Sequence, residues 1–306
     1  VGKAALTSNT TGSYNTAVGT DALDDNTASN NTGIGYRALY QNTTGGQNTG
    51  LGAQSLYNVT TGENNTAVGM NALYTNSTAD NNTAVGKDSL KLNTTGTKNT
   101  ALGVESLYSN TTANNNSALG YAALYTNTTG AQNTAIGVNA LLANTTASDN
   151  TAVGYNALAA NTTGANNVAM GYNSLDANTT GGNNTGLGFA ALGGNTGASN
   201  NTAVGYLALN ETTTGANNVS VGSEALEKNT TGGANIAIGA QALEASTTAD
   251  YNVAIGYQAM HVSTSAYKNV SIGSYSLDAL TTGDSNICIG HDAGTDLTTG
   301  SNTVCI

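Results

Sequence analysis

Two cysteines and two histidines are the side chains in the sequence best suited to bind zinc, and the cysteines could also form a disulfide. Cys288 and Cys305 are separated by 17 residues, the same interval that recurs throughout the chain. If successive units stack about 4.8 Å apart, the Cα atoms of this pair fall within the range of a disulfide. The pair is therefore a candidate disulfide, and the alternative is two small buried thiols. His261 and His291 could complete a zinc site with it only at a spacing that matches no zinc finger, so we assign no metal site.

No arrangement of residues in the sequence points to catalysis. The histidines lie near one end, the carboxylates are scattered, and no nucleophile motif is present. The Gly-rich, Asp-containing repeat of calcium-binding β-rolls is also absent. We expect neither an enzyme nor a cofactor.

Pairs of threonine recur in most units and would present rows of hydroxyl groups if the units stack. Examples are Thr43-Thr44, Thr94-Thr95, Thr162-Thr163 and Thr230-Thr231. A regular hydroxyl array is what an ice-binding solenoid needs, whereas threonine also simply suits strands and strand ends. The sequence is compatible both with an ice-binding surface and with a purely structural role of these threonines.

Tyrosines cluster at two positions of the unit and are the candidate contact residues for a glycan or a protein. One group directly follows the repeat glycine. A second group, in the N-terminal half, follows the leucine that stands four residues after that glycine. The second group, our candidate surface contacts, comprises Tyr40, Tyr57, Tyr74, Tyr108 and Tyr125. The alternative is a half-exposed row that shields the stack.

These side chains are positioned by a strict repeat whose clearest copy is Asn-Thr-Ala-Val-Gly at Asn15 to Gly19. Its glycines recur at intervals of 17 residues, with a single interval of 16 between Gly19 and Gly35. Such a repeat predicts a stack of near-identical coils, and the whole of residues 1–306 forms one repeat domain of about 18 coils.

The residues before each repeat glycine alternate as in a strand. A β-branched residue is followed by a small one and then by an aliphatic one, which predicts a short parallel strand. The Ala-Leu segment and the Asn-Thr-Thr-Gly turn that follow predict a second short strand and a return turn. The fold class is therefore all-β, a parallel β-solenoid or β-roll with a 17-residue repeat.

The asparagine that opens each strand predicts an amide ladder, in which identical side chains hydrogen-bond along the stack. Members of this asparagine ladder include Asn48, Asn65, Asn82, Asn99, Asn116, Asn133, Asn150 and Asn167.

Composition excludes several classes of function. The formal charge is −11 and no basic stripe exists, which argues against nucleic acids and anionic membranes as partners. No apolar run approaches transmembrane length, so we expect no membrane insertion within this segment. The fixed register of the apolar residues argues against a disordered tract.

A slender coil can bury only one side of its strands, yet both sides here carry small or apolar residues. The other side needs a partner, and we expect a homo-oligomer, with a parallel trimer as its form.

The Asn-Thr-Ala-Val-Gly strand resembles the Ser-x-Ala-Ile-Gly strand in the head repeats of YadA-like trimeric autotransporter adhesins. The complete unit is also similar to repeat regions of phage tail fibres. This resemblance covers all 306 residues and departs from the adhesin heads in its longer period. It implies a trimeric fibre, displayed outside the cell, on a cell surface or on a virion, that attaches to a host glycan or protein.

We therefore expect a structural or adhesive segment of a longer fibre protein. The alternatives are an ice-binding solenoid with stacked threonines and a self-assembling filament without a ligand.

Overall fold

The computed structural model describes residues 1–306 and is an all-β parallel solenoid of about 17 turns without helices. The predicted fold class is therefore confirmed, while the trimer is not addressed by a single chain. The chain divides into two compact units, Val1–Asn150 and Thr151–Ile306.

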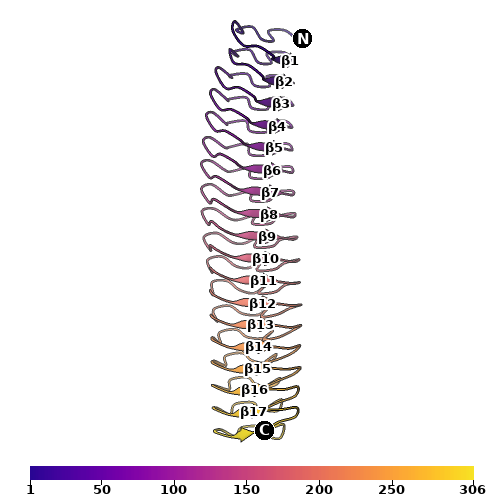
Figure 1. Ribbon diagram of the computed structural model, residues 1–306, viewed down its shortest axis with the longest axis vertical. Helices are drawn as coiled ribbons and strands as arrows, with labels where there is room; N and C mark the ends of the chain where they lie inside the picture. Colours follow the sequence, from indigo (N-terminus) through magenta and orange to yellow (C-terminus); the bar gives the residue numbers. More distant parts are fainter. The chain divides into compact units, whose positions relative to one another are not determined.

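The first unit contains eight strands, one per coil, each of three residues and each paired in parallel with the next (Figure 1). The register pairs equivalent residues of successive coils, so that Thr66 lies beside Thr83 and Val68 lies beside Val85. The strands are β1 (Thr16–Val18), β2 (Thr32–Ile34), β3 (Thr49–Leu51), β4 (Thr66–Val68), β5 (Thr83–Val85), β6 (Thr100–Leu102), β7 (Ser117–Leu119) and β8 (Thr134–Ile136).

The second unit repeats this arrangement with ten strands, and only β18 is shorter, with two residues. Parallel pairing again places equivalent residues side by side, for example Ile238 and Ile255. The strands are β9 (Thr151–Val153), β10 (Val168–Met170), β11 (Thr185–Leu187), β12 (Thr202–Val204), β13 (Val219–Val221), β14 (Ile236–Ile238), β15 (Val253–Ile255), β16 (Val270–Ile272), β17 (Ile287–Ile289) and β18 (Val304–Cys305).

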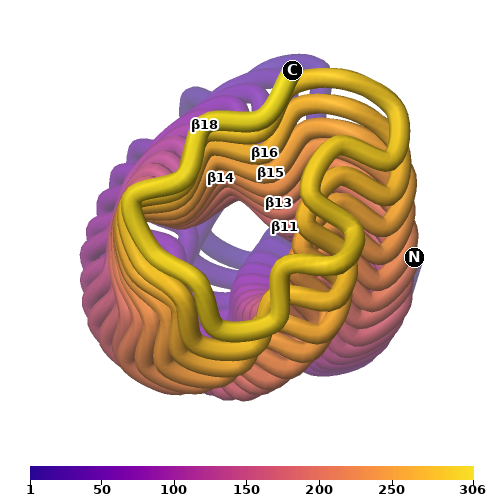
Figure 2. The backbone as a smooth tube through the Cα atoms, turned by 90° about the horizontal axis from the view of Figure 1, so that it is seen from below, coloured from indigo at the N-terminus to yellow at the C-terminus, as the bar shows by residue number.

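The interior of each coil is filled by the small central residue of the strand and by the leucine that follows the glycine. In the coil of β4, Ala67 and Leu73 are both fully buried. Figure 2 shows the coils end-on as irregular loops, with the strands of the second unit on one side. The interior is too narrow for a large residue opposite each leucine, which explains the constant small residue.

The repeat glycine occupies a conformation closed to other residues. Gly103 has φ +141°, and a Cβ added there would approach the carbonyl oxygen of Gly120, in the next coil, within 2.3 Å. Both conditions, the positive φ and the close approach of two backbones, demand glycine. They recur at the equivalent glycine of most coils.

The predicted second strand is wrong: the segment after each glycine alternates right- and left-handed residues instead. Arg37 and Leu39 both have φ near +54°, which no strand contains. Their backbone groups still bond along the stack, because Leu39 N donates to Ser55 O at 2.9 Å and Arg37 N donates to Thr20 O at 3.0 Å. Axial hydrogen bonds with coils on both sides therefore replace a second sheet.

Candidate functional site

The outer face of the strands carries two columns of side chains that nothing in the chain covers. The central strand residue is buried in every coil from β1 to β17, so its two neighbours point outward. The residue immediately before each repeat glycine forms what we call the aliphatic column. The residue two places earlier forms the second, outer column, which begins as threonine and becomes valine or isoleucine toward the C-terminus.

The aliphatic column is exposed in both units. In the first unit Leu51 is 45% exposed and Leu102 is 44% exposed, although each is a large apolar side chain. The column comprises Val18, Ile34, Leu51, Val68, Val85, Leu102, Leu119 and Ile136 in the first unit, and Val153, Met170, Leu187, Val204, Val221, Ile238, Ile255, Ile272 and Ile289 in the second.

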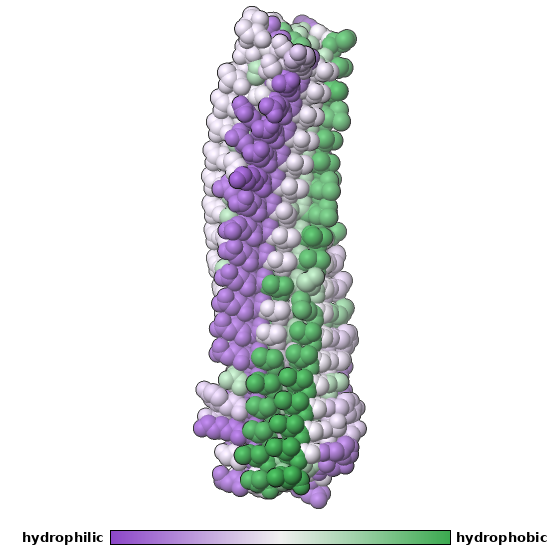
Figure 3. All heavy atoms as spheres, in the orientation of Figure 1, coloured by the Kyte–Doolittle hydropathy of each residue, from purple (hydrophilic) through white to green (hydrophobic).

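In the C-terminal part of the second unit both outer columns are aliphatic. Ile236 and Ile238 of β14 are 37% and 38% exposed, and Ile287 and Ile289 of β17 are 44% and 43% exposed. In Figure 3 this region is the broad green area at the bottom of the view. Neither column carries a charged residue in any coil, although the chain contains 25 charged side chains, 18 acidic and 7 basic. A continuous apolar, uncharged face of this kind marks an interaction surface.

The predicted threonine rows are present, but the first hydroxyl group of each of these pairs is hydrogen-bonded to a backbone carbonyl. Thr43 Oγ1 donates to Thr60 O at 2.9 Å, and Thr94 Oγ1 donates to Thr111 O at 3.0 Å. The same bond forms at Thr162 and Thr230. The first threonine of each pair therefore closes a turn, and the second threonine is exposed in all four of these pairs.

The asparagine ladder is confirmed. Asn65 N and Nδ2 both donate to Asn48 Oδ1, at 2.9 and 3.1 Å, and Asn65 Nδ2 also donates to Ala79 O at 2.8 Å. The pattern repeats at Asn82, Asn99, Asn116, Asn133 and Asn150 in the first unit. In the second unit Asn184 N donates to Asn167 Oδ1 at 2.9 Å. These asparagines are fully buried, so the ladder supplies the partners that buried amides require.

A second asparagine ladder was missed by the sequence analysis. The asparagine of the Asn-Thr-Thr-Gly turn is also fully buried, and Asn93 Nδ2 donates both to Asn76 Oδ1 at 2.8 Å and to Gly96 O at 2.9 Å. The sequence feature that predicts this second ladder is the fixed position of the asparagine, three residues before the turn glycine or alanine.

The candidate tyrosines lie in stacked columns. The rings of Tyr40 and Tyr57 are 5.3 Å apart, those of Tyr57 and Tyr74 are 5.0 Å apart, and Tyr108 stacks on Tyr125 at 5.1 Å. Each ring is half-buried, and Tyr57 has a stacked ring on both of its faces. Their contact with a glycan or a protein stays a prediction, and it would involve the ring edges and the ends of the stacks.

Cys288 of β17 and Cys305 of β18 lie in register, as predicted, and both are free thiols. Burial, helped by a hydrogen bond with Cys305, raises the pKa of the Cys288 thiol to about 12. The disulfide stays a prediction. The histidines are apart from this pair: His261 Nδ1 is 3.3 Å from Glu244, and His291 Nδ1 is 2.8 Å from Asp292. No cluster of three potential metal ligands occurs in the chain.

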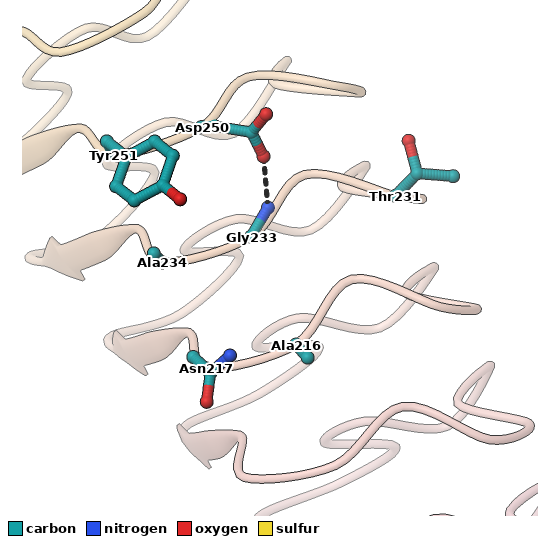
Figure 4. Close-up of a pocket in the computed structure, with 7 residues that line it drawn as sticks. All are labelled: Ala216, Asn217, Thr231, Gly233, Ala234, Asp250 and Tyr251. Carbon is teal, nitrogen blue, oxygen red and sulfur yellow. Dashed lines mark hydrogen bonds between the residues drawn. The ribbon is translucent and has the colours of Figure 1, made fainter.

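One shallow pocket of about 210 Å³ opens at the turns of the second unit (Figure 4). Its only carboxylate, Asp250, accepts a hydrogen bond from Gly233 N at 2.6 Å and so caps a turn backbone. The carboxylate of the pocket is thus held by the backbone of the neighbouring coil. It is lined by Ala216, Asn217, Thr231, Gly233, Ala234, Asp250 and Tyr251.

Comparison with known proteins assigns no family. No protein-family model matches the chain, and no curated protein matches it at a significant level. None of its segments is a helix that could cross a bilayer.

Proposed function

We propose that the chain is a structural and adhesive segment of a fibre outside the cell, on a cell surface or on a virion. Copies of the chain assemble through the aliphatic column into a parallel homotrimer. The assembled surface then makes repeated weak contacts with a host glycan or protein.

The observation that carries this proposal is the uncovered aliphatic column. Monomeric soluble proteins rarely leave a continuous apolar surface of this extent in contact with water. The column and its outer neighbour carry no charge, so copies can meet there without repulsion even though the chain is acidic overall. A second copy of the same chain is the simplest partner because it presents the same surface at the same spacing.

The width of the surface favours a threefold arrangement. Each coil contributes only one strand with two outward residues, for example Ile236 and Ile238 of β14. Around a threefold axis the apolar strand face of each chain packs against both of the other chains. Because the symmetry is closed, no copy is left with this face exposed to water. Parallel chains keep identical coils at the same level.

Attachment then follows from repetition. The exposed second threonine and the tyrosine columns recur from coil to coil, and three chains multiply them. Contacts that are individually weak gain apparent affinity when several form at once.

A glycan array tests the adhesive part of this proposal. The chain should bind a subset of surface glycans, and the variant Ile238→Lys/Ile255→Lys should bind them far more weakly because assembly and avidity are lost. Binding that is unaffected by this variant would contradict the multivalent mechanism. Assembly without binding to any glycan or cell would favour the self-assembling filament instead.

The outer threonine column of the first unit favours ice binding as the second candidate. Thr49, Thr66 and Thr83 point outward from adjacent strands, next to the aliphatic column. They are a better hydroxyl array than the turn pairs, whose first hydroxyl groups are bonded to backbone. Thermal hysteresis that disappears in Thr66→Lys/Thr83→Lys would establish this function in place of attachment.

A further inference from the structure

One coil of the first unit holds a cation between two tyrosine rings. The guanidinium carbon of Arg37 lies 5.0 Å from the ring centroid of Tyr36 and 5.2 Å from that of Tyr40. Arg37 Nε also donates to Asp21 Oδ2, in the preceding coil, at 3.1 Å. Two aromatic rings and a carboxylate are the groups that bind a guanidinium best.

The same arrangement recurs in one other coil, without the cation. Among all the coils, tyrosines stand one and five residues after the repeat glycine only at Tyr36 and Tyr40 and at Tyr121 and Tyr125. In the second case the position of the arginine is occupied by Ala122.

The carboxylate is conserved between the two coils as well. Asp21 stands two residues after Gly19, and Glu105 stands two residues after Gly103, so each lies one coil before its tyrosine pair. Asp21 pairs with Arg37, whereas Glu105 forms no direct ion pair in the chain. The nearby Lys87 is 2.9 Å from Asp88 and interacts with Glu105 only through a weaker, longer-range attraction between the charges.

The coil of Tyr121 and Tyr125 has an open pocket at the position that corresponds to the side chain of Arg37. A pocket of about 260 Å³ opens over Ala122, which is only 5% exposed and forms its floor. We call this pocket the Ala122 notch, and it is lined by Glu105, Tyr121, Ala122, Tyr125, Asn139 and Leu142.

The walls of the notch are suited to hold a cation. The Tyr121 residue is 52% exposed and accessible from outside, while Tyr125 is held in place by stacking on Tyr108 at 5.1 Å. Burial raises the pKa of Tyr125, and the negative charge of Glu105 adds to the effect, which indicates a negative potential at the ring. The same tyrosine stack already accepts one cation, because Lys91 Nζ lies 5.3 Å from the Tyr108 ring centroid.

We propose that the Ala122 notch binds a guanidinium group from a partner, with an arginine side chain as its natural ligand. The geometry of Tyr36, Arg37, Tyr40 and Asp21 is the internal template for this site. The site uses other residues than the trimer proposed above, because its tyrosines follow the repeat glycine and the aliphatic column precedes it.

Titration with a blocked arginine tests the proposal on the intact chain. Nα-acetylarginine methylamide should shift the ring signals of Tyr121 and Tyr125 in the NMR spectrum, in a saturable way and with millimolar affinity. The matched citrulline derivative has the same shape without the charge and should give no saturable shift. Ethylguanidinium distinguishes recognition of the cation alone from recognition of an arginine residue in a peptide.

Variants of the notch locate the binding. Ala122→Arg should abolish it because the chain then supplies its own guanidinium, while circular dichroism and melting stay unchanged or improve. Glu105→Gln should weaken binding about tenfold, since a charge-assisted contact is lost. Glu63→Gln, which removes an exposed carboxylate in another coil, is the matched control and should leave binding unchanged.

Arg37→Ala provides the reverse test. Removing this guanidinium should open a second notch between Tyr36 and Tyr40, beside Asp21, and raise the number of bound arginine derivatives from one to two. The proposal is wrong if the arginine derivative shifts neither Tyr121 nor Tyr125, if the citrulline derivative binds equally well, or if Ala122→Arg binds as the parent chain does.

Discussion

The backbone amide of Asn99 donates to the side-chain oxygen of Asn82, one coil earlier, at 2.9 Å, and both residues are fully buried. Asn82 in turn donates from its side-chain amide to Gly96 O at 2.8 Å. Each member of the ladder therefore satisfies backbone groups of its neighbours, and no water can replace it.

Asn82→Ala should destabilise the first unit by roughly 2 to 4 kcal/mol, because it leaves the Asn99 amide buried without a partner and removes one of the two hydrogen bonds that Gly96 O accepts. Urea denaturation followed by circular dichroism measures the change. Asn114→Ala is the control: Asn114 Oδ1 accepts from Thr97 N at an exposed site, where water takes over, so the loss should be much smaller. Equal losses for both variants would contradict a structural ladder.

Gly103→Ala should prevent proper stacking of its coil. The φ of +141° and the 2.3 Å approach of the added Cβ to Gly120 O together cost on the order of 3 kcal/mol or more. Gly46→Ala is the matched control, since its Cβ would meet only Ser29 O at 3.3 Å and its φ is ordinary. Thermal melting compares the two variants. A Gly103→Ala chain as stable as the parent would contradict the close contact between the backbones at Gly103 and Gly120.

Asp88 should make the first unit sensitive to acid. Partial burial would raise its pKa, but hydrogen bonds from Asn71, Lys87 and Lys91 outweigh this effect and lower the pKa to about 2. A depressed pKa in the folded chain stabilises it above the unfolded value near 4, and this contribution disappears as the pH falls toward 2.

Asp88→Asn should therefore reduce stability at neutral pH by on the order of 1 to 2 kcal/mol and flatten its dependence on pH between about 4 and 2. Glu63→Gln serves as the control, with an unchanged profile in this window. Denaturation at a series of pH values gives the comparison, and an identical slope for the parent chain and Asp88→Asn would refute the role of Asp88.

The two thiols should differ in reactivity. Cys288 is fully buried with a raised pKa, whereas Cys305 is half-buried, so iodoacetamide at about pH 8 should modify Cys305 much faster. Peptide mass spectrometry reads out each site, and both should react equally after unfolding. The disulfide predicted from their spacing is checked by the same method after mild oxidation. Equal labelling in the folded chain would mean that the β17–β18 pairing is incorrect.

The sequence predicts the strands well because each unit places the same residue above the same residue. One outward residue that is nearly always β-branched, one small buried residue and one large apolar residue recur before the repeat glycines of the strands. A parallel stack is the structure that satisfies all copies together. The ladder through Asn48 and Asn65 follows from the same logic, since a buried amide needs a partner at the coil spacing.

The segment after the glycine could not be predicted from local preferences. Leu39 has a left-handed conformation that leucine rarely adopts, and nothing in Ala-Leu-Tyr indicates it. The conformation is imposed by axial hydrogen bonds such as that from Leu39 N to Ser55 O, which exist only once coils are stacked. The Ala122 notch was missed for the same reason: the relation of Tyr121 to Glu105 spans two coils.

Assembly through the aliphatic column is the central claim, and sedimentation equilibrium tests it most directly. The chain should sediment with the mass of a trimer, and Ile238→Lys/Ile255→Lys should shift it to monomer, because charges then face the apolar surface of the neighbours. Thr231→Lys/Thr248→Lys adds the same charge at exposed turns and should leave the trimer intact. A parent chain that sediments as a folded monomer at every concentration would contradict the account.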